Sequence, residues 1–557
     1  MSGNSVLRRA RPIVLLAAAW GLLAPLATRG QGGEPRTFAI RGAKVFPVSS
    51  APIENATIVV SKGLITAVGA NVTIPPDAWM IDGKGLLVYP GLFDAFTDVG
   101  LTSPSAPPAD KGEKQRAIAR GPEDRPETTP WRKAEDEVNA TDPRVESWRS
   151  AGFTTVVTVP KGGMFPGQAA ILDLGEEHAG ELVVKSPVAL PVSLQASGGF
   201  RSYPGSLMGA IAYVRQVWLD TNWGTQASAL YQKDPRGMER PKYTRSDAAI
   251  AEALAKHAVV LLPGNESLQI RRALRLAQEW KLNAVLYGVQ MAYEVAPEIA
   301  AAKTPVLVNL KWPEASKDAD PEDTPSLREL RFRDRAPATP AALDKAGVKF
   351  AFYSDGISAP KDLLPAVKKA MDAGLSGDAA LRALTLSPAE IFGVSQVLGS
   401  IEGGKIANLV VADGDLFDKK TKVKMVFVDG KKYEVRELLR PSEPPKGSLT
   451  GKWQLKFTSP QGEEEATADL TMEPDGTLTG MVSSEHGTGT VFSGWVSGDK
   501  FSFTINVQIE GNAGDVLFTG TLEGNSMKGT IQAMGYTLPF TATKPDASAG
   551  LQEGGAE

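Results

Sequence analysis

The strongest constraint on the fold is an alternation of short apolar runs with helix-like segments across the middle of the chain. The apolar runs have the length and β-branched content of buried strands, at residues 153–159, 258–262, 283–287, 304–309 and 348–353. Segments with apolar residues at helical spacing occur at 266–281, 361–373 and 377–384. Strands that alternate with helices indicate βαβ units and a parallel sheet.

Shorter β-prone runs flank this central region. Four occur between residues 36 and 88, and two more at 403–413 and 423–431. Beyond a linker rich in proline, strand-like runs with glycine-centred turns recur about every ten residues from 448 to 543. That regular spacing predicts a separate antiparallel barrel or sandwich.

The run Tyr89-Pro-Gly-Leu-Phe-Asp-Ala-Phe-Thr-Asp98 stands just before the central region. It resembles the end of the first barrel strand in the metal-dependent amidohydrolase superfamily, in particular the imidazolonepropionase-like exported members. In that family the run ends in His-x-His, which binds a divalent metal, whereas here Phe96 and Asp98 occupy the two positions. Asp355, in Tyr353-Ser-Asp-Gly356, matches the family's catalytic aspartate after the eighth strand.

The resemblance implies an α/β fold: a (β/α)8 TIM-like barrel flanked by a small composite β-sandwich, plus a C-terminal all-β domain. The expected divisions are a signal peptide (1–30), the composite sandwich (36–88 and 395–435), the barrel (89–394), the C-terminal module (448–543) and a disordered tail (544–557). About seven barrel strands can be placed. No clean seventh strand is visible in the charged, irregular stretch 313–340.

Histidine is too scarce for an ordinary site of this family. Only His178, His257 and His486 occur in 557 residues, and none is paired with another. By resemblance, Tyr287 stands where relatives carry a histidine on the fifth strand, and the sixth strand offers Asn309. No metal is therefore expected. If one binds, its ligands are Asp98 and Asp355, and the ion is zinc, magnesium or calcium.

Six residues are candidates for chemistry or for binding. Asp355 is a proton shuttle by resemblance, or a carboxylate that caps the turn after its strand. Gly162, Gly163 and Gln168 lie in a loop after the second strand, where backbone amides could meet a substrate carboxylate or glycines could simply form tight turns. Tyr287 and Asn309 are the further candidates for substrate binding.

The N-terminus predicts export. Arg8, Arg9 and Arg11 precede the apolar run 13–26, which is short for a membrane span, so a cleaved signal peptide is expected and an uncleaved anchor is the alternative. The mature protein is then periplasmic or extracellular, with no membrane association. The chain has no cysteine, which removes disulfides and thiolate chemistry. Its net charge of −4 gives no sign of a nucleic-acid partner.

Three functions follow from these observations. The first is a degenerate hydrolase of non-peptide C–N bonds, amide or cyclic amide, which binds a small amide-like ligand or pairs with an active amidohydrolase paralogue. The second is an active hydrolase that uses an atypical oxygen-ligated metal held by Asp98 and Asp355. The third is an envelope-binding protein that acts through its C-terminal β module.

Overall fold

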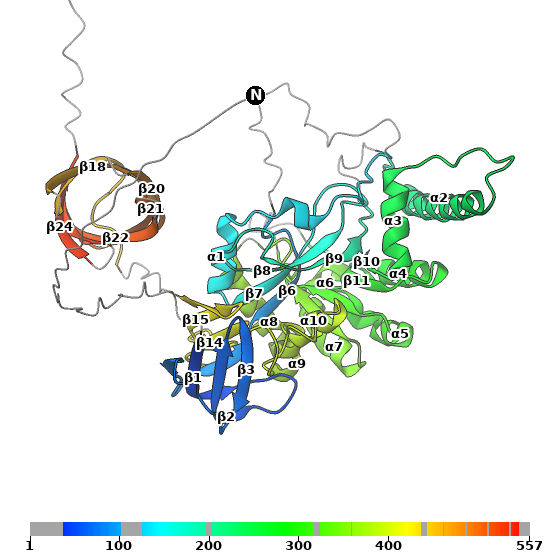
Figure 1. The fold of residues 1–557 in the computed structure, drawn as a ribbon, viewed down its shortest axis with the longest axis horizontal. Helices are drawn as coiled ribbons and strands as arrows, with labels where there is room; N and C mark the ends of the chain where they lie inside the picture. Colours follow the sequence, from blue (N-terminus) through cyan, green and yellow to red (C-terminus); the bar gives the residue numbers. More distant parts are fainter. Residues whose placement is uncertain are drawn as a thin grey trace, which may run out of the picture. The chain divides into compact units, whose positions relative to one another are not determined.

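A computed structural model describes ten stretches of the chain: residues 37–101, 125–195, 203–315, 324–357, 359–435, 443–459, 462–484, 487–509, 512–533 and 536–544. These form two compact units, divided after Val435 (Figure 1). The expected signal peptide, nearly all of the expected tail and His486 lie outside the described residues.

Eight strands form a nearly closed ring in the first unit. In order around the sheet they are β6 (Leu92–Thr97), β7 (Phe153–Thr158), β8 (Ala169–Asp173), β9 (Val183–Pro191), β10 (Val259–Gly264), β11 (Ala284–Gly288), β12 (Val306–Asn309) and β13 (Phe350–Tyr353). The last strand, β13, lies beside the first. Side chains alternate between two cores, as Leu261 packs inside the ring and Leu262 packs outside it, under the helices.

The expected barrel fold is confirmed, but one strand runs against the others. β8 is antiparallel to both β7 and β9, while the remaining neighbours are parallel. The described part of the charged stretch 313–340 contributes no strand to the ring, in line with the lack of a clean strand pattern there. It holds α6 (Leu327–Arg335) and a 3-10 turn instead. β8 has only five residues, all buried, so it shows no alternation by which the sequence would reveal it.

Helices cover the outside of the ring. Besides α6 they are α1 (Pro143–Ser150), α2 (Leu207–Lys233), α3 (Arg245–Ala255), α4 (Ser267–Glu279), α5 (Ala296–Ala302), α7 (Thr339–Lys345), α8 (Leu363–Asp372), α9 (Gly377–Ala383) and α10 (Leu386–Ile391). The segments predicted at 266–281, 361–373 and 377–384 are confirmed as α4, α8 and α9. In α4, Ile270, Ala273 and Leu276 face the barrel at helical spacing.

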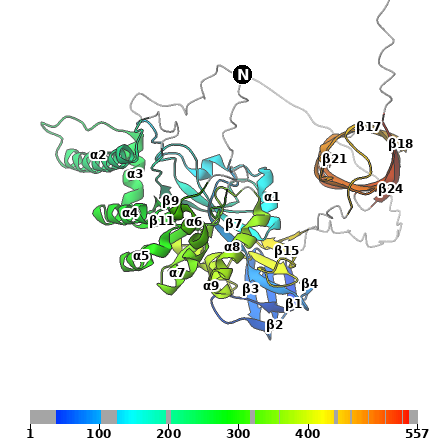
Figure 2. The same cartoon turned by 180° about the vertical axis from the view of Figure 1, so that it is seen from behind.

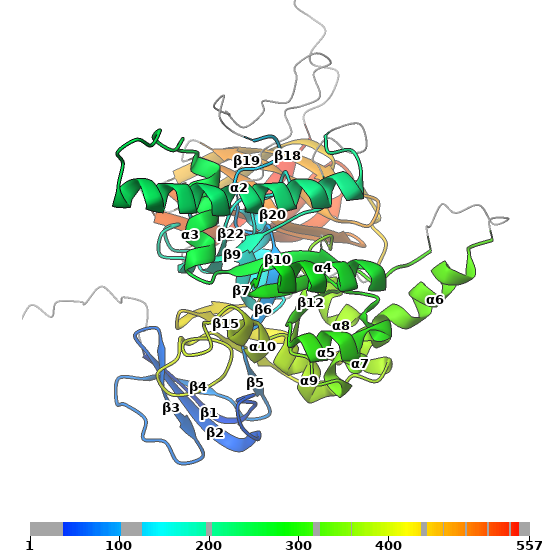
Figure 3. The same cartoon turned by 90° about the vertical axis from the view of Figure 1, so that its right-hand side faces the viewer.

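The longest helix, α2, has no counterpart in the sequence-based expectations. It begins after Ser206, whose hydroxyl accepts a hydrogen bond from Gly209 N at 3.1 Å. Figure 3 shows it crossing the same side of the barrel as α3 and α4. Neither α2 nor any other helix in the described part of the chain combines the length and apolarity that a membrane crossing requires.

Both flanks of the barrel contribute to one eight-stranded sheet (Figure 2). Its members are β1 (Thr37–Val45), β2 (Ile53–Ser61), β3 (Leu64–Gly69), β4 (Trp79–Asp82), β5 (Leu87–Pro90), β14 (Leu409–Ala412), β15 (Val423–Val428) and β16 (Lys431–Glu434). β5 pairs with β14, so the chain entering the barrel lies against the chain leaving it. β6 begins two residues after Pro90, which ends β5, so this pairing also fixes where the first strand of the ring starts.

The second unit is a closed barrel of eight antiparallel strands, each paired with the next and β24 paired with β17. The strands are β17 (Gly451–Ser459), β18 (Gly462–Met472), β19 (Leu478–Ser484), β20 (Gly487–Ser497), β21 (Lys500–Ile509), β22 (Asn512–Glu523), β23 (Ser526–Ala533) and β24 (Tyr536–Thr543). Trp453, Phe501, Phe503, Phe518 and Phe540 belong to its buried core. The all-β module expected from the strand spacing is confirmed.

Candidate functional site

Three aromatic rings meet where the barrel strands β6, β11 and β13 end. Phe96 stacks on Tyr287, with ring centroids 5.0 Å apart and planes 15° apart, and meets Tyr353 edge-on at 5.4 Å. The Tyr287 hydroxyl donates to the Val192 carbonyl at 3.0 Å. Burial raises the pKa of both phenols well above the ordinary value, so they stay neutral. Two of the three positions at which the family resemblance implies histidine, those of Phe96 and Tyr287, therefore hold one packed, uncharged aromatic pair.

Beside the rings, the ammonium group of Lys161 bridges two carboxylates. Its Nζ lies 2.9 Å from Asp98 Oδ2 and 3.0 Å from Asp355 Oδ1. Asp98 follows β6, Lys161 follows β7 and Asp355 follows β13, so the bridge joins three strand ends. Burial lowers the pKa of Lys161, but its bonds to the two aspartates outweigh this, and the net pKa is raised. The lysine is held as a cation.

Asp98 has a second cationic partner. Arg144, near the start of α1, donates from Nη1 to Asp98 Oδ1 at 2.8 Å and from Nη2 to the Asp98 carbonyl at 2.9 Å. Arg144 is itself held by Asp142, the N-cap residue of α1. Burial raises the pKa of Asp98, but Lys161 and Arg144 more than offset this, and the net pKa falls below its ordinary value. Both oxygens of the carboxylate are thus occupied by protein cations.

Asn309 positions the turn that carries Asp355. Its Nδ2 donates to the Asp355 carbonyl at 2.9 Å, and its Oδ1 accepts from Lys311 N at 2.6 Å. The Asp355 side chain is 36% exposed, and its other described contact is the bond to Lys161. Sequence reasoning therefore brought Asp98, Tyr287, Asn309 and Asp355 to one end of the barrel, and the structure places all four there.

The loop 161–168 is fixed by contacts with the segment after Arg125. Gly163 has φ +82°, and a Cβ there would lie 2.8 Å from the Glu127 carbonyl oxygen. The buried Gln168 side chain donates to the Pro130 carbonyl at 2.9 Å. Gly162 has φ +101° with open space around it. Of the three expected binding residues, Gly163 and Gln168 hold the loop in place, and the loop in turn carries Lys161.

Asp94, in the middle of β6, is the buried charge that sequence reasoning missed. Its Oδ1 accepts from Ser354 N at 3.0 Å and from Phe96 N at 3.3 Å. Its Oδ2 accepts from Ser354 Oγ and from Trp148 Nε1 at 3.4 Å. Burial raises the pKa of Asp94 to about 6, although these hydrogen bonds lower it. Asp94 ties the first strand of the ring to the residue after the last.

The donor set at the strand ends does not fit a divalent metal. Among the described residues, no three His, Cys, Asp or Glu side chains are grouped so that they could hold an ion. The carboxylates of Asp98 and Asp355 share one ammonium, and two carboxylates are few for the six or more oxygens that calcium takes. His257, with φ +50°, lies between α3 and the start of β10, at the opposite end of that strand from the strand ends that carry Asp98 and Asp355. A metal would have to displace Lys161.

Comparison with known proteins agrees with this architecture. Residues 308–433 match the model of the amidohydrolase family. The crystal structure of an amidohydrolase from Thermotoga maritima MSB8 is 28% identical, with a TM-score of 0.59, and the match covers 72% of this chain and 100% of that one. Both matches support the amidohydrolase-superfamily assignment that the run 89–98 predicted.

Other solved amidohydrolase-like structures are more distant. A Xaa-Pro dipeptidase with bound methionine is 16% identical with a TM-score of 0.45, over 72% of this chain and 100% of that one. Phenylurea hydrolase B is 14% identical with a TM-score of 0.42, over 72% and 97%. These likenesses are too weak to indicate a substrate for this amidohydrolase. No curated protein matches it significantly.

Proposed function

We propose that this amidohydrolase has reduced or lost metal-dependent hydrolysis of non-peptide C–N bonds, and that it acts as a ligand-binding protein or as the partner of an active paralogue. The observation that carries the proposal is the bridge from Lys161 to Asp98 and Asp355. A fixed ammonium supplies the positive charge that a divalent ion would otherwise give these carboxylates. It has no open coordination position, so it cannot activate a water molecule as a metal does.

The aromatic pair supports the same conclusion independently of charge. Phe96 offers no donor atom, and Tyr287 is neutral with its hydroxyl directed to the Val192 carbonyl. Their rings pack together at 5.0 Å. An ion that needs nitrogen ligands from β6 and β11 has none at either position, because Phe96 carries only carbon and the Tyr287 hydroxyl is hydrogen-bonded to Val192.

What remains at the barrel end suits binding of a polar ligand. Lys161 is 53% exposed and Asp355 36% exposed, so both can contact a ligand while they remain paired. An amide-like molecule presents a carbonyl acceptor and an N–H donor, which match an ammonium and a carboxylate. Export to the periplasm or beyond is part of the proposal and rests on the basic-apolar N-terminal sequence alone.

Metal content tests the proposal most directly. Purified protein is incubated with Zn²⁺, Mn²⁺ or Mg²⁺, desalted, and analysed by mass spectrometry of the elements, alongside turnover assays on a linear anilide and a cyclic imide. We expect well under one equivalent of metal and no metal-dependent turnover. The alternative of an oxygen-ligated metal predicts one retained equivalent, with both metal and turnover lost in Asp355→Ala; that result would overturn the proposal.

A matched pair of variants tests the role of the lysine. Lys161→Met frees Asp98 Oδ2 and Asp355 Oδ1, so it should bind added Mg²⁺ or Mn²⁺ more tightly than the wild type. Lys133→Met removes one positive charge from a nearby loop, where the lysine pairs with Glu135, and should leave metal binding unchanged. Equal metal binding by wild type and Lys161→Met would show that the ammonium does not compete with an ion.

The C-terminal module receives no separate proposal. Its interior is filled by aromatic side chains such as Trp453 and Phe503, both fully buried. A ligand of this module would have to bind its outer surface.

A further inference from the structure

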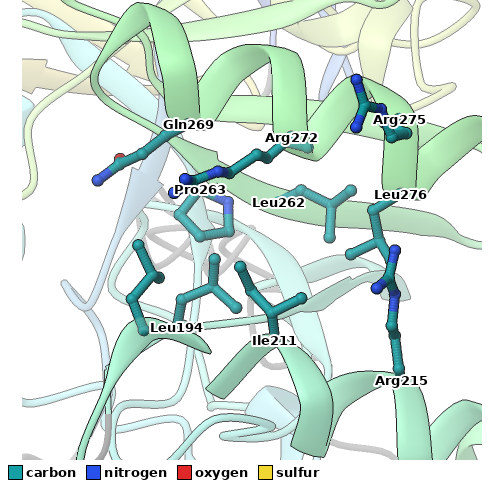
Figure 4. Close-up of a pocket in the computed structure, with 11 residues that line it drawn as sticks. Leu194, Ile211, Arg215, Leu262, Pro263, Gln269, Arg272, Arg275 and Leu276 are labelled. Atoms are coloured by element: carbon teal, nitrogen blue, oxygen red, sulfur yellow. The ribbon is translucent and has the colours of Figure 1, made fainter. Parts of the chain in front are cut away.

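A pocket of about 220 Å³ lies between β10, α2 and α4 (Figure 4). Its apolar lining consists of Leu194, Leu207, Ile211, Leu262, Pro263, Ala273 and Leu276. Leu262 and Leu276 belong to the core outside the ring of strands, whereas the neighbouring Leu261 faces the core inside it. The wall of the barrel therefore separates this pocket from the bridge formed by Lys161. At the roughly 30 Å³ that one water molecule takes up in the liquid, the pocket has room for about seven groups of that size.

Hydrogen-bond donors without partners surround this apolar lining. Arg215 bonds to Glu279 through Nη2 at 2.6 Å, but its buried Nε has no hydrogen-bond partner. Arg272 forms no ion pair or hydrogen bond with the residues that the structure describes. Gln269 accepts from Asn265 N through its oxygen, which leaves its Nε2 free to donate.

Figure 4 shows where these donors lie. The Arg272 side chain extends past Pro263 toward Gln269, and the Arg215 guanidinium lies beside Leu276. Arg272 and Gln269 are three residues apart on α4, so they project from the same side of the helix. The pocket thus has the guanidinium of Arg272 and the amide donor of Gln269 at one end and an apolar middle. At the other end lie Arg275 and Arg215, whose Nε has no hydrogen-bond partner.

We propose that this pocket binds a monocarboxylate with an unbranched apolar chain of roughly six to eight carbon atoms. The carboxylate pairs with the guanidinium of Arg272 and accepts from Gln269 Nε2, because a guanidinium fork matches a carboxylate in shape and charge. The chain lies against Ile211 and Leu262. A bare inorganic anion would leave this apolar lining unused, and an uncharged chain would leave Arg272 without a counter-charge.

Calorimetric titration of the full-length protein with octanoate, below its micelle concentration, tests the proposal. Inorganic phosphate and 1-octanol serve as comparison probes, and we expect each to bind at least about tenfold more weakly than octanoate. Arg272→Ala should weaken octanoate binding at least about tenfold, since it removes the charged partner. Ile211→Trp should abolish binding by filling the pocket.

Arg271→Ala is the matched control, because it removes the same charge from the same helix on the side that faces Glu298. It should change octanoate affinity less than about twofold. Octanoate affinity that is unchanged in Arg272→Ala, or 1-octanol binding as tightly as octanoate, would overturn the proposal. Phosphate binding as tightly as octanoate would do so too. Arg272 is exposed, so its variant decides the question even if Ile211→Trp fails to fold.

Discussion

Asp94 gives the barrel a pH-dependent stability that one substitution should remove. Its side chain is 1% exposed, and its pKa in the folded protein is about 6, against 3.8 ordinarily. Below about pH 4 the carboxyl is protonated in both the folded and the unfolded chain. As the pH rises from about 4 to 6, the unfolded chain releases its proton first, so the free energy of unfolding falls. From the difference between the two pKa values, the loss is about 3 kcal/mol at pH 7.

Asp94→Asn should abolish this loss while keeping most contacts. The amide oxygen can accept from Ser354 N and Phe96 N, as Asp94 Oδ1 does. The amide nitrogen can donate to Ser354 Oγ, which reverses the direction of the present bond. The weak bond from Trp148 Nε1, at 3.4 Å, is the contact that is lost. Relative to wild type, the variant should therefore gain about 3 kcal/mol between pH 4 and 7.

Because the chain has two compact units, the stability of the barrel must be read separately from that of the C-terminal module. Urea titrations at pH 4, 5, 6 and 7, followed by hydrogen exchange of peptides from β6 and β13, report on the barrel alone. Ser354→Ala is the opposing control. It removes a hydrogen bond that lowers the pKa of Asp94, so it should deepen the loss above pH 4. The reasoning would be refuted if the free energies of unfolding of wild type and Asp94→Asn changed with pH by the same amount.

Three further substitutions follow from individual contacts. Gly163→Ala should destabilise the barrel by about 1–3 kcal/mol more than Gly162→Ala in urea titrations, because only at Gly163 does a Cβ meet a carbonyl oxygen at 2.8 Å. Lys161→Met should lower the free energy of unfolding above about pH 4. The difference from wild type should shrink as the pH falls through the lowered pKa of Asp98, as measured by thermal unfolding between pH 2 and 7. Phe503→Ala should cost the C-terminal barrel about 3–5 kcal/mol and leave exchange in residues 37–435 unchanged, since Phe503 is fully buried in the core of that unit.

Local sequence pattern accounts for much of the barrel. The apolar runs near residues 153, 258, 283, 304 and 348 became β7, β10, β11, β12 and β13, because parallel strands buried on both faces are continuously apolar. The pattern failed at β8, which is short and antiparallel within a ring of parallel strands. It also failed at α2, whose exposed Met208, Leu219 and Trp223 blur the amphipathic period.

The candidate site divides in the same way. Asp98 and Asp355 could be placed from the resemblance, because each follows a recognisable strand. Lys161 could not, since its partners lie on strands that come together only when the ring closes. The role of Asp94 was equally hidden, although it lies in the recognised run, because its partner Ser354 is 260 residues away.

Phe96, Lys161 and Tyr287 each prevent metal binding at the barrel end, so restoring a metal site should require substitutions at all three positions. Phe96→His alone would place an imidazole against the Tyr287 ring, while Lys161 would still hold Asp98 Oδ2 and Asp355, so no carboxylate would be available beside the imidazole. Tyr287→His alone would leave Phe96 without a donor. We therefore expect neither single variant to bind Zn²⁺ measurably. Phe96→His, Tyr287→His and Lys161→Met combined should bind it, because imidazoles at 96 and 287 and the Asp98 Oδ2 that Lys161 releases supply three ligands. Isothermal titration with Zn²⁺ distinguishes these variants, and tight binding by either single histidine variant would show that the three positions act independently.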